Sequence, residues 1–137
     1  MSRSIWDYKK AHMIGVKGVG MTALAEILQN NGFALTGSDV KEGFMTDEVL
    51  LRLGISVADF DARNLSGKDA AIRSNAYTEE NAEVKEATER EIPLFSYPEV
   101  VAELFNAHYG VAIAGSHGKT TTTAMLAHIL KDRKSVV

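Results

Sequence analysis

The chain has 137 residues, which suits one compact α/β domain and little more. Hydrophobic residues make up 45% and charged residues 24%, and the formal net charge of -3 without a basic stretch argues against nucleic acid as a partner. Because cysteine is absent, disulfides, thiolate metal sites and thiol nucleophiles are excluded. No leader-like segment or membrane-spanning apolar run is found in the sequence, so we expect a cytoplasmic protein without membrane insertion.

Short apolar runs alternate with helical patterns along the chain. The runs typical of buried strands are residues 13–16, 33–35, 70–72, 92–95 and 111–114. Strands that alternate with helices predict an α/β fold, a Rossmann-like parallel sheet with helices on both faces.

Caps and helical spacing mark the helices between these runs. Thr46 precedes two acidic residues, and Thr78 precedes a polar helix expected to run through Arg90. Ser96 and Glu99 have the spacing of a capping box. Further helices are predicted directly after Gly20 and over residues 120–130.

The first glycine-rich loop, residues 15–20, lies between a predicted strand and a predicted helix. Glycines at such a bend permit a tight turn and a close approach of the backbone to a diphosphate. Lys17 stands where the usual dinucleotide fingerprint has its second glycine, and Asp39 follows at about the distance of a ribose-binding carboxylate. The loop alone is compatible with a nucleotide site or with an ordinary strand–helix turn.

The second loop, residues 115–120, reads Gly-Ser-His-Gly-Lys-Thr between a predicted strand and the last helix. Phosphate loops need small residues whose N–H groups converge on the anion, a lysine for the β- and γ-phosphates and a hydroxyl for Mg²⁺. All three are present, although Ile113 stands where the common form has its first glycine. His117 within this loop is as readily a spacer as a ligand contact.

Other chemically capable residues fit structural roles. The three histidines outside the second loop, among them His12, have no metal-ligand spacing and are interpreted as structural or solvent-facing. The acidic residues within 79–91 are interpreted as a solvated helix face, not as paired catalytic carboxylates. Met21 and Met125 are predicted to pack in the core.

Four segments occur in the order seen in the Mur ligases, a family that the chain resembles from about residue 11 to residue 130. They are Gly18-Val19-Gly20-Met21, Gly37-Ser38-Asp39, Ser74-Asn75-Ala76 with residues 80–84, and residues 112–122. The histidine before Gly-Lys-Thr resembles the branches that act on UDP-N-acetylmuramate, either adding L-alanine or recycling a tripeptide. The Gly-x-Gly-Met start of the first helix favours the alanine-adding branch.

The resemblance implies an N-terminal domain that holds the UDP part of UDP-N-acetylmuramate. The implied UDP-sugar residues are Gly18, Val19, Gly20, Met21, Ser38, Asp39, Ser74, Asn75 and Ala76. The implied ATP residues are Gly115, Ser116, His117, Gly118, Lys119, Thr120 and Thr121. Lys119 would act catalytically on the β- and γ-phosphates, and Thr120 or Thr121 would hold Mg²⁺.

The implied reaction belongs to peptidoglycan precursor synthesis. ATP would phosphorylate the muramate carboxylate, and the amine of L-alanine would then displace phosphate from the acyl phosphate. Lys17 and Asn75 depart from the family pattern, which frequently has glycine and serine there.

We expect residues 1–107 to form the UDP-sugar domain and residues 108–131 to begin a truncated ATP-binding domain. Such an N-terminal fragment would have no ligase activity of its own. Residues 132–137 match the translation of a common short-read sequencing adapter and are expected to be a non-native tail. An NAD-dependent oxidoreductase and a complete, non-catalytic nucleotide-binding module are the alternatives from other classes. The oligomeric state does not follow from the sequence.

Overall fold

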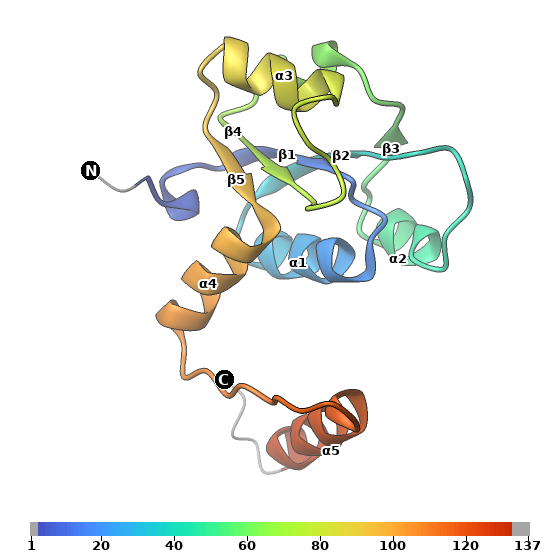
Figure 1. Ribbon diagram of the computed structural model, residues 1–137, viewed down its shortest axis with the longest axis vertical. Helices are drawn as coiled ribbons and strands as arrows, with labels where there is room; N and C mark the ends of the chain where they lie inside the picture. Colours follow the sequence, from blue (N-terminus) through green and yellow to red (C-terminus); the bar gives the residue numbers. More distant parts are fainter. Residues whose placement is uncertain (1–2, 133–137) are drawn as a thin grey trace. The chain divides into compact units, whose positions relative to one another are not determined.

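Five parallel strands form one sheet in the described part of residues 1–107, the first of two units in the computed structural model. The strands are β1 Lys10–Ile14, β2 Ala34–Ser38, β3 Val57–Ala58, β4 Ala70–Arg73 and β5 Leu94–Ser96, and their order across the sheet is β3-β2-β1-β4-β5 (Figure 1). The structure describes residues 3–132. The chain runs outward from β1 to β3 and then returns to β4, so the strand order reverses between β1 and β4. The predicted parallel α/β fold is confirmed.

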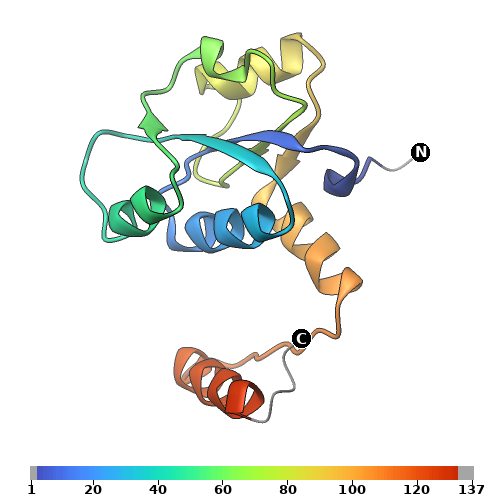
Figure 2. The ribbon, with the colours of Figure 1, turned by 180° about the vertical axis from the view of Figure 1, so that it is seen from behind.

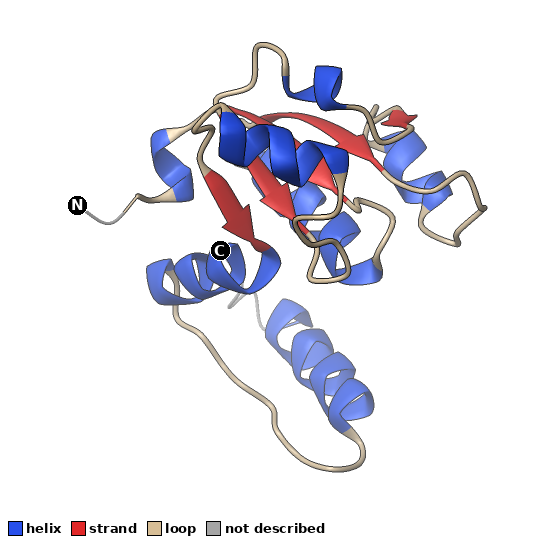
Figure 3. Cartoon of the chain, turned by 45° about the horizontal axis from the view of Figure 1, so that its top comes forward, coloured by secondary structure: helices blue, strands red, loops and turns tan. Residues whose placement is uncertain are grey.

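The carboxyl ends of the strands lie in one row across the sheet. Ile14 is opposite Ser38 on one side and opposite Arg73 on the other. Ser38 is in turn opposite Ala58, and Arg73 is opposite Ser96. Every loop that follows a strand therefore starts from the same edge of the sheet (Figure 3).

Helices cover both faces of this sheet (Figures 1 and 2). One face carries α1 Val19–Asn30 and α2 Asp47–Arg52, and the other carries α3 Ala82–Glu89 and the 3₁₀ helix η2 Ala62–Leu65. The 3₁₀ helix η1 Ile5–Asp7 precedes β1, and α4 Tyr97–Ala107 follows β5 without a loop.

The alternation of side chains along β1 divides the core into two layers. Met13 is fully buried and packs in one layer with Leu24 and Leu28 of α1. Ile14 points to the other face and packs in the second layer with Val84 of α3. Because successive side chains of a strand point to opposite faces, a single strand supplies both layers.

The helix predicted from Thr78 to Arg90 starts later than expected. Asn81, not Thr78, is the N-cap of α3, and its side-chain oxygen accepts hydrogen bonds from the backbone N–H groups of Glu83 at 2.9 Å and Val84 at 3.4 Å. The backbone N–H of Asn81 donates to the carbonyl of Thr78 in a turn. Asparagine caps a helix at least as well as threonine, and here it lies next to the helical residues.

Two other predicted cap residues precede their helices as expected, but their side chains make different hydrogen bonds from those of a usual N-cap. Thr46 precedes α2, but its hydroxyl donates to the carbonyl of Lys17 at 2.5 Å and caps no helical N–H. In the predicted capping box, the Glu99 carboxylate accepts hydrogen bonds from the backbone N–H and the hydroxyl of Ser96, both at 2.6 Å. The glutamate half of that motif is therefore confirmed.

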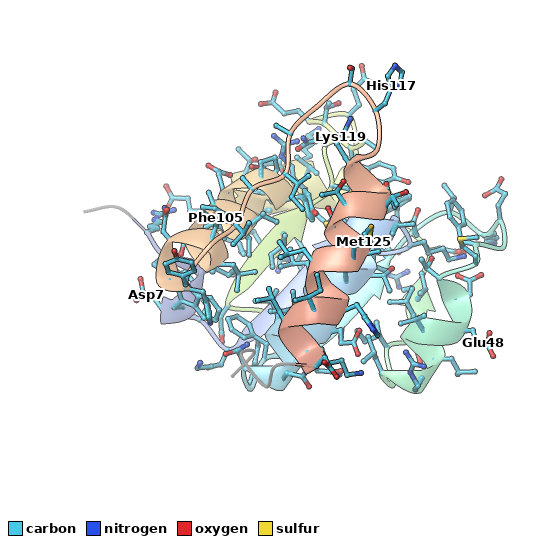
Figure 4. All side chains as sticks on the ribbon, turned by 90° about the horizontal axis from the view of Figure 1, so that it is seen from below. Asp7, Glu48, Phe105, His117, Lys119 and Met125 are labelled. Atoms are coloured by element: carbon cyan, nitrogen blue, oxygen red, sulfur yellow. The ribbon has the colours of Figure 1, made fainter. Side chains whose placement is uncertain are left out.

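The second unit contains the helix α5 Lys119–Asp132, preceded by residues 108–118. The strand predicted over residues 111–114 is not formed, since a strand needs a hydrogen-bonded neighbour and the described residues of this unit include no other strand. Along α5 no described residue is buried, and Met125 is 61% exposed, so its predicted core packing is wrong (Figure 4). Of the expected tail, residues 132–137, only Asp132 lies within the described residues. Across residues 3–132, no helix combines the length and apolar character needed to cross a membrane.

Candidate functional site

A pocket of about 180 Å³ opens where the strand order reverses between β1 and β4. Its lining residues come from three segments at the carboxyl edge of the sheet: Gly18, Gly20, Met21, Ser74, Asn75 and Tyr97. Parallel α/β sheets bind ligands at this place, outside the strand ends at the switch in strand order. Two segments that the sequence marks separately, after β1 and after β4, therefore meet in one pocket.

The turn after β1 depends on Gly15. Its φ of 81° is in the left-handed region, and a Cβ there would lie 2.5 Å from the ring of Tyr77 and 2.9 Å from the Cβ of Ser74. The backbone N–H groups of Gly15 and Val16 donate to the carbonyl of Ser38 at 2.9 and 3.1 Å. Only glycine permits this backbone approach, which brings the walls of the pocket together.

The amino end of α1 lies at the pocket and has no side-chain cap. Gly18 is the N-cap residue, and as a glycine it makes no side-chain capping hydrogen bond. The first four N–H groups of a helix have no partner within it and favour an anion. Of the predicted residues here, Gly18, Gly20 and Met21 line the pocket, whereas Val19 does not line it and is 69% exposed.

Lys17 does not point its charge into the pocket. Its Nζ donates to the carbonyl of Glu42 at 2.7 Å, lies 3.4 Å from the Asp47 carboxylate and is 5.6 Å from the centre of the Phe44 ring. Only 7% of its side chain is exposed. The residue that interrupts the glycine pattern thus joins the first loop to residues 40–46, a connection that the sequence pattern did not indicate.

Both carboxylate oxygens of Asp39 accept hydrogen bonds from other groups of the protein. Its Oδ2 accepts a hydrogen bond from the backbone N–H of Lys17 at 2.8 Å, and its Oδ1 accepts from the N–H of Val40 at 2.8 Å and the hydroxyl of Tyr77 at 2.9 Å. Burial, and next the hydrogen bond to Asp39, raise the pKa of Tyr77 to about 12. Asp39 therefore joins the loops after β1, β2 and β4.

Ser38 is also placed inside the protein. It is fully buried, and its hydroxyl donates to the carboxylate of Glu83 at 2.5 Å. His12 lies beside both groups, with its Nε2 3.1 Å from the Ser38 hydroxyl and 3.4 Å from Glu83 Oε1, while its Nδ1 is 2.7 Å from the hydroxyl of Thr36. The predicted structural role of His12 is consistent with this position.

Glu83 is the centre of this buried network, so its interpretation as part of a solvated face is wrong. It also accepts hydrogen bonds from the backbone N–H of Asp61 at 3.1 Å and the side-chain amide of Asn64 at 2.7 Å. Burial alone raises the pKa of Glu83, but the hydrogen bonds from its partners outweigh burial and hold this pKa below its ordinary value. The spacing of Glu83 one helical turn before the buried Ala87 is the signal that could have identified it.

The wall after β4 contains the remaining predicted residues of this site. Ser74 and Asn75 line the pocket, whereas Ala76 is exposed and its N–H donates to the Ser74 hydroxyl at 3.3 Å. Tyr97, at the start of α4, completes the wall and was not among the residues predicted from the sequence. Its position depends on β5 leading directly into α4, which local motifs do not reveal.

The second glycine-rich loop has a compact arrangement of its own. The ammonium group of Lys119 donates to the carbonyl of Gly115 at 2.6 Å, and the N–H of Thr122 donates to the carbonyl of Gly118 at 3.0 Å. All residues from 115 to 121 are exposed, and His117 lies at the outer tip of the loop (Figure 4). Within residues 3–132, no cluster of three or more histidine, aspartate or glutamate residues is suited to hold a metal ion.

Comparison with known proteins gives a family match over most of the chain. A family model described as "Mur ligase family, catalytic domain" matches residues 10–109. The UDP-N-acetylmuramate–L-alanine ligase of Treponema pallidum is 49% identical over 126 residues, which are 90% of this chain and 26% of that protein. The ligase of the same name from Desulfitobacterium hafniense is 47% identical over 116 residues, 84% of this chain and 26% of that protein. The chain thus spans about a quarter of the length of these relatives.

Two solved structures share the fold closely. The UDP-N-acetylmuramate–alanine ligase of Thermotoga maritima superposes with a TM-score of 0.83 at 31% identity, covering 91% of this chain and 30% of that one. The UDP-N-acetylmuramate:L-alanyl-γ-D-glutamyl-meso-diaminopimelate ligase of Neisseria meningitides also has a TM-score of 0.83, at 34% identity, covering 90% of this chain and 40% of that one.

Proposed function

Because this chain belongs to the Mur ligase family, we propose that residues 1–107 bind UDP-N-acetylmuramate for an ATP-dependent ligase that adds L-alanine to it. The observation that carries this proposal is the pocket at the switch point, which combines the glycine turn after β1 with Ser74 and Asn75 after β4. A volume of about 180 Å³ is smaller than a typical small-molecule pocket, so it suits one polar group of a ligand that extends beyond it.

The diphosphate is the group that best matches the pocket. The uncapped N–H groups at the start of α1 favour an anion, and the glycines 18 and 20 allow it to approach the backbone. Ser74 and Asn75 would offer a hydroxyl and an amide from the opposite wall. The side chains of Ser38 and Asp39 already make hydrogen bonds within the protein. They would therefore act on the nucleoside end of the ligand indirectly, by holding the neighbouring loops in place.

For the second loop, we propose binding of ATP with Mg²⁺. Backbone N–H groups of residues 115–118 would surround the phosphates, with Lys119 meeting the β- and γ-phosphate charge and Thr120 or Thr121 ligating the metal. The bond of Lys119 to the Gly115 carbonyl would then be exchanged for phosphate oxygens. When bound, Mg²⁺ would offset the negative charge of the triphosphate.

The proposed reaction has two balanced steps. A carboxylate oxygen of the muramate displaces ADP from the γ-phosphorus of ATP, which forms an acyl phosphate. The amine of L-alanine then attacks the acyl carbon, phosphate leaves with the electron pair of the broken C–O bond, and the amine loses a proton. Lys119 would stabilise the charge on the transferred phosphoryl group, which is an electrostatic task.

Calorimetric titration of the purified chain with UDP-N-acetylmuramate, UDP and NAD tests the first part of the proposal. We expect saturable binding of both uridine nucleotides and no binding of NAD. Gly20→Ala should weaken this binding, since a Cβ there would lie 2.7 Å from the hydroxyl oxygen of Tyr97, at the pocket wall. Gly43→Ala is the matched control, since its Cβ would lie 3.9 Å from Asp47 Oδ2, an ordinary van der Waals contact, and its φ is not in the left-handed region. Binding of NAD in place of the uridine nucleotides would contradict the proposal.

A second candidate is a ligase that recycles a peptide onto the same nucleotide sugar. The neighbour from Neisseria meningitides supports it, because its TM-score equals that of the alanine ligase from Thermotoga maritima and its sequence identity is 34% against 31%. Both names include UDP-N-acetylmuramate, so binding to residues 1–107 is common to the two candidates. ADP release by the protein that carries this chain, measured with L-alanine and with the tripeptide as alternative acceptors, separates them.

A further inference from the structure

Tyr97 brings a phenol hydroxyl into the proposed diphosphate pocket. It lines this pocket together with Gly18 and Gly20, and a Cβ on Gly20 would lie 2.7 Å from its hydroxyl oxygen and 2.9 Å from its Cζ. The hydroxyl therefore lies directly beside the first turn of α1. A glycine at position 20 is what leaves room for it.

The hydroxyl of Tyr97 is available for a ligand. In the part of the chain that the structure describes, it makes no hydrogen bond to another protein group. The nearby Tyr77 contrasts with it, because the hydroxyl of Tyr77 is committed to Asp39 at 2.9 Å. The ring of Tyr97 packs against the core layer that contains Val100 and Phe95, so its direction is fixed before a ligand arrives.

We propose that Tyr97 is a ligand-contact residue whose hydroxyl donates a hydrogen bond to a phosphate oxygen of the UDP diphosphate. This inference rests on the proposed function, since it assigns a further contact within the same pocket. A phenol hydroxyl can donate a hydrogen bond to an anion without changing the charge of the site. The N–H groups at the start of α1 would bind the same anion.

The test compares Tyr97→Phe with Tyr109→Phe. The first change removes only the hydroxyl and keeps the packed ring, while the second removes the hydroxyl of a tyrosine that is 99% exposed. Calorimetric titration with UDP and with uridine separates contacts to phosphate from contacts to the nucleoside. Loss of a hydrogen bond to a charged group predicts UDP binding about 10- to 100-fold weaker in Tyr97→Phe. Uridine binding and the behaviour of Tyr109→Phe should match the wild type.

Each other outcome has a definite meaning. If the wild type binds UDP and Tyr97→Phe binds it equally well, the contact to phosphate is refuted while the proposed function stands. If UDP and uridine lose affinity equally, the hydroxyl serves the nucleoside and the inference is wrong. If the wild type does not bind UDP, the proposed function itself fails.

A measurement on wild-type protein covers the case in which the variant folds poorly. With ¹³Cζ-labelled tyrosine the chain gives four tyrosine signals. We expect the Tyr97 signal, assigned in the wild type from through-space contacts with Gly20, to move on addition of UDP and to stay in place with uridine. A Tyr97 signal that is unaffected by saturating UDP would overturn the inference.

Discussion

Replacing Glu83 by glutamine should destabilise the first unit although it leaves the proposed pocket intact. The change keeps the size of the side chain and removes its charge. The carboxylate accepts hydrogen bonds from the Ser38 hydroxyl, the Asp61 N–H and the Asn64 amide, and it lies 3.4 Å from His12 Nε2. All these groups surround a side chain that is 0% exposed, so water cannot replace a lost partner.

The expected magnitude follows from the number and type of these bonds. A hydrogen bond to a charged group contributes about 1.5–3 kcal/mol and a neutral one about 0.5–1.5 kcal/mol, so removing the charge costs about 1 kcal/mol for each donor. With the donors Ser38, Asp61 and Asn64, we expect Glu83→Gln to lower the free energy of unfolding by about 2–4 kcal/mol. Such a loss is a large part of the roughly 5–15 kcal/mol that stabilises a typical domain.

Urea unfolding followed by fluorescence measures this loss. The single tryptophan, Trp6, packs edge-on against Phe33 of the core, with the ring centroids 5.9 Å apart. Its fluorescence therefore reports on the unfolding of this unit. Glu80→Gln, at an exposed position just before the same helix, should change the free energy of unfolding by less than about 0.5 kcal/mol. If both variants unfold at the same urea concentration as the wild type, the buried carboxylate does not stabilise the fold as argued.

Acidification tests the same charge independently. The pKa of Glu83 in the folded state lies below its ordinary value of 4.5. The carboxylate therefore contributes its full stability above that value, and the contribution is lost as the pH falls through the lower, folded pKa. The difference in stability between the wild type and Glu83→Gln should be constant at neutral pH and should shrink on acidification below about pH 4.5. A difference that grows in acid would contradict the direction of the shift.

Three further substitutions test contacts within the first unit. Lys17→Met keeps the buried stem but removes the ammonium group, so amide hydrogen exchange should become faster in residues 40–46; unchanged exchange there would show that the charge does not hold this segment. Gly15→Ala should lower the thermal midpoint of unfolding and also weaken UDP binding, because its Cβ would lie 2.5 Å from the ring of Tyr77. A variant as stable as the wild type would refute the close approach of this backbone to Tyr77. Asn81→Ala should cost about 1 kcal/mol in urea unfolding, and a loss below about 0.3 kcal/mol would show that the cap is dispensable.

Strands β1, β2, β4 and β5 and the two glycine-rich loops were predictable because their signals are local, whereas the two-residue strand β3 was not predicted. An apolar run that ends at glycine, such as the one before Gly15, predicts both a strand and the turn after it. The meeting of this turn with Ser74 and Asn75 follows from parallel strands whose ends share an edge. Tyr97 was not predicted, because it reaches the pocket only through the direct connection of β5 to α4, which no local motif indicates.

The errors come from contacts that a local pattern does not contain. Glu83 resembles its acidic neighbours in the sequence, but its partners lie on β1, β2 and η2. Lys17 interrupts a glycine motif, and only the fold shows that its charge is directed to Glu42 and Asp47. Residues 111–114 have the apolar character of a strand, but strand formation requires a partner as well as a propensity.

The row in which the strands end makes this edge of the protein intolerant of insertions. One extra residue within β1 or β4 would push the following turn outward by about 3.3 Å and would reverse the faces to which later side chains point. Length changes at the opposite edge, in the segments that lead into β2 and β4, shift no pocket wall. Peptide tags and grafted sequences for biophysical work therefore belong at the edge where the strands begin.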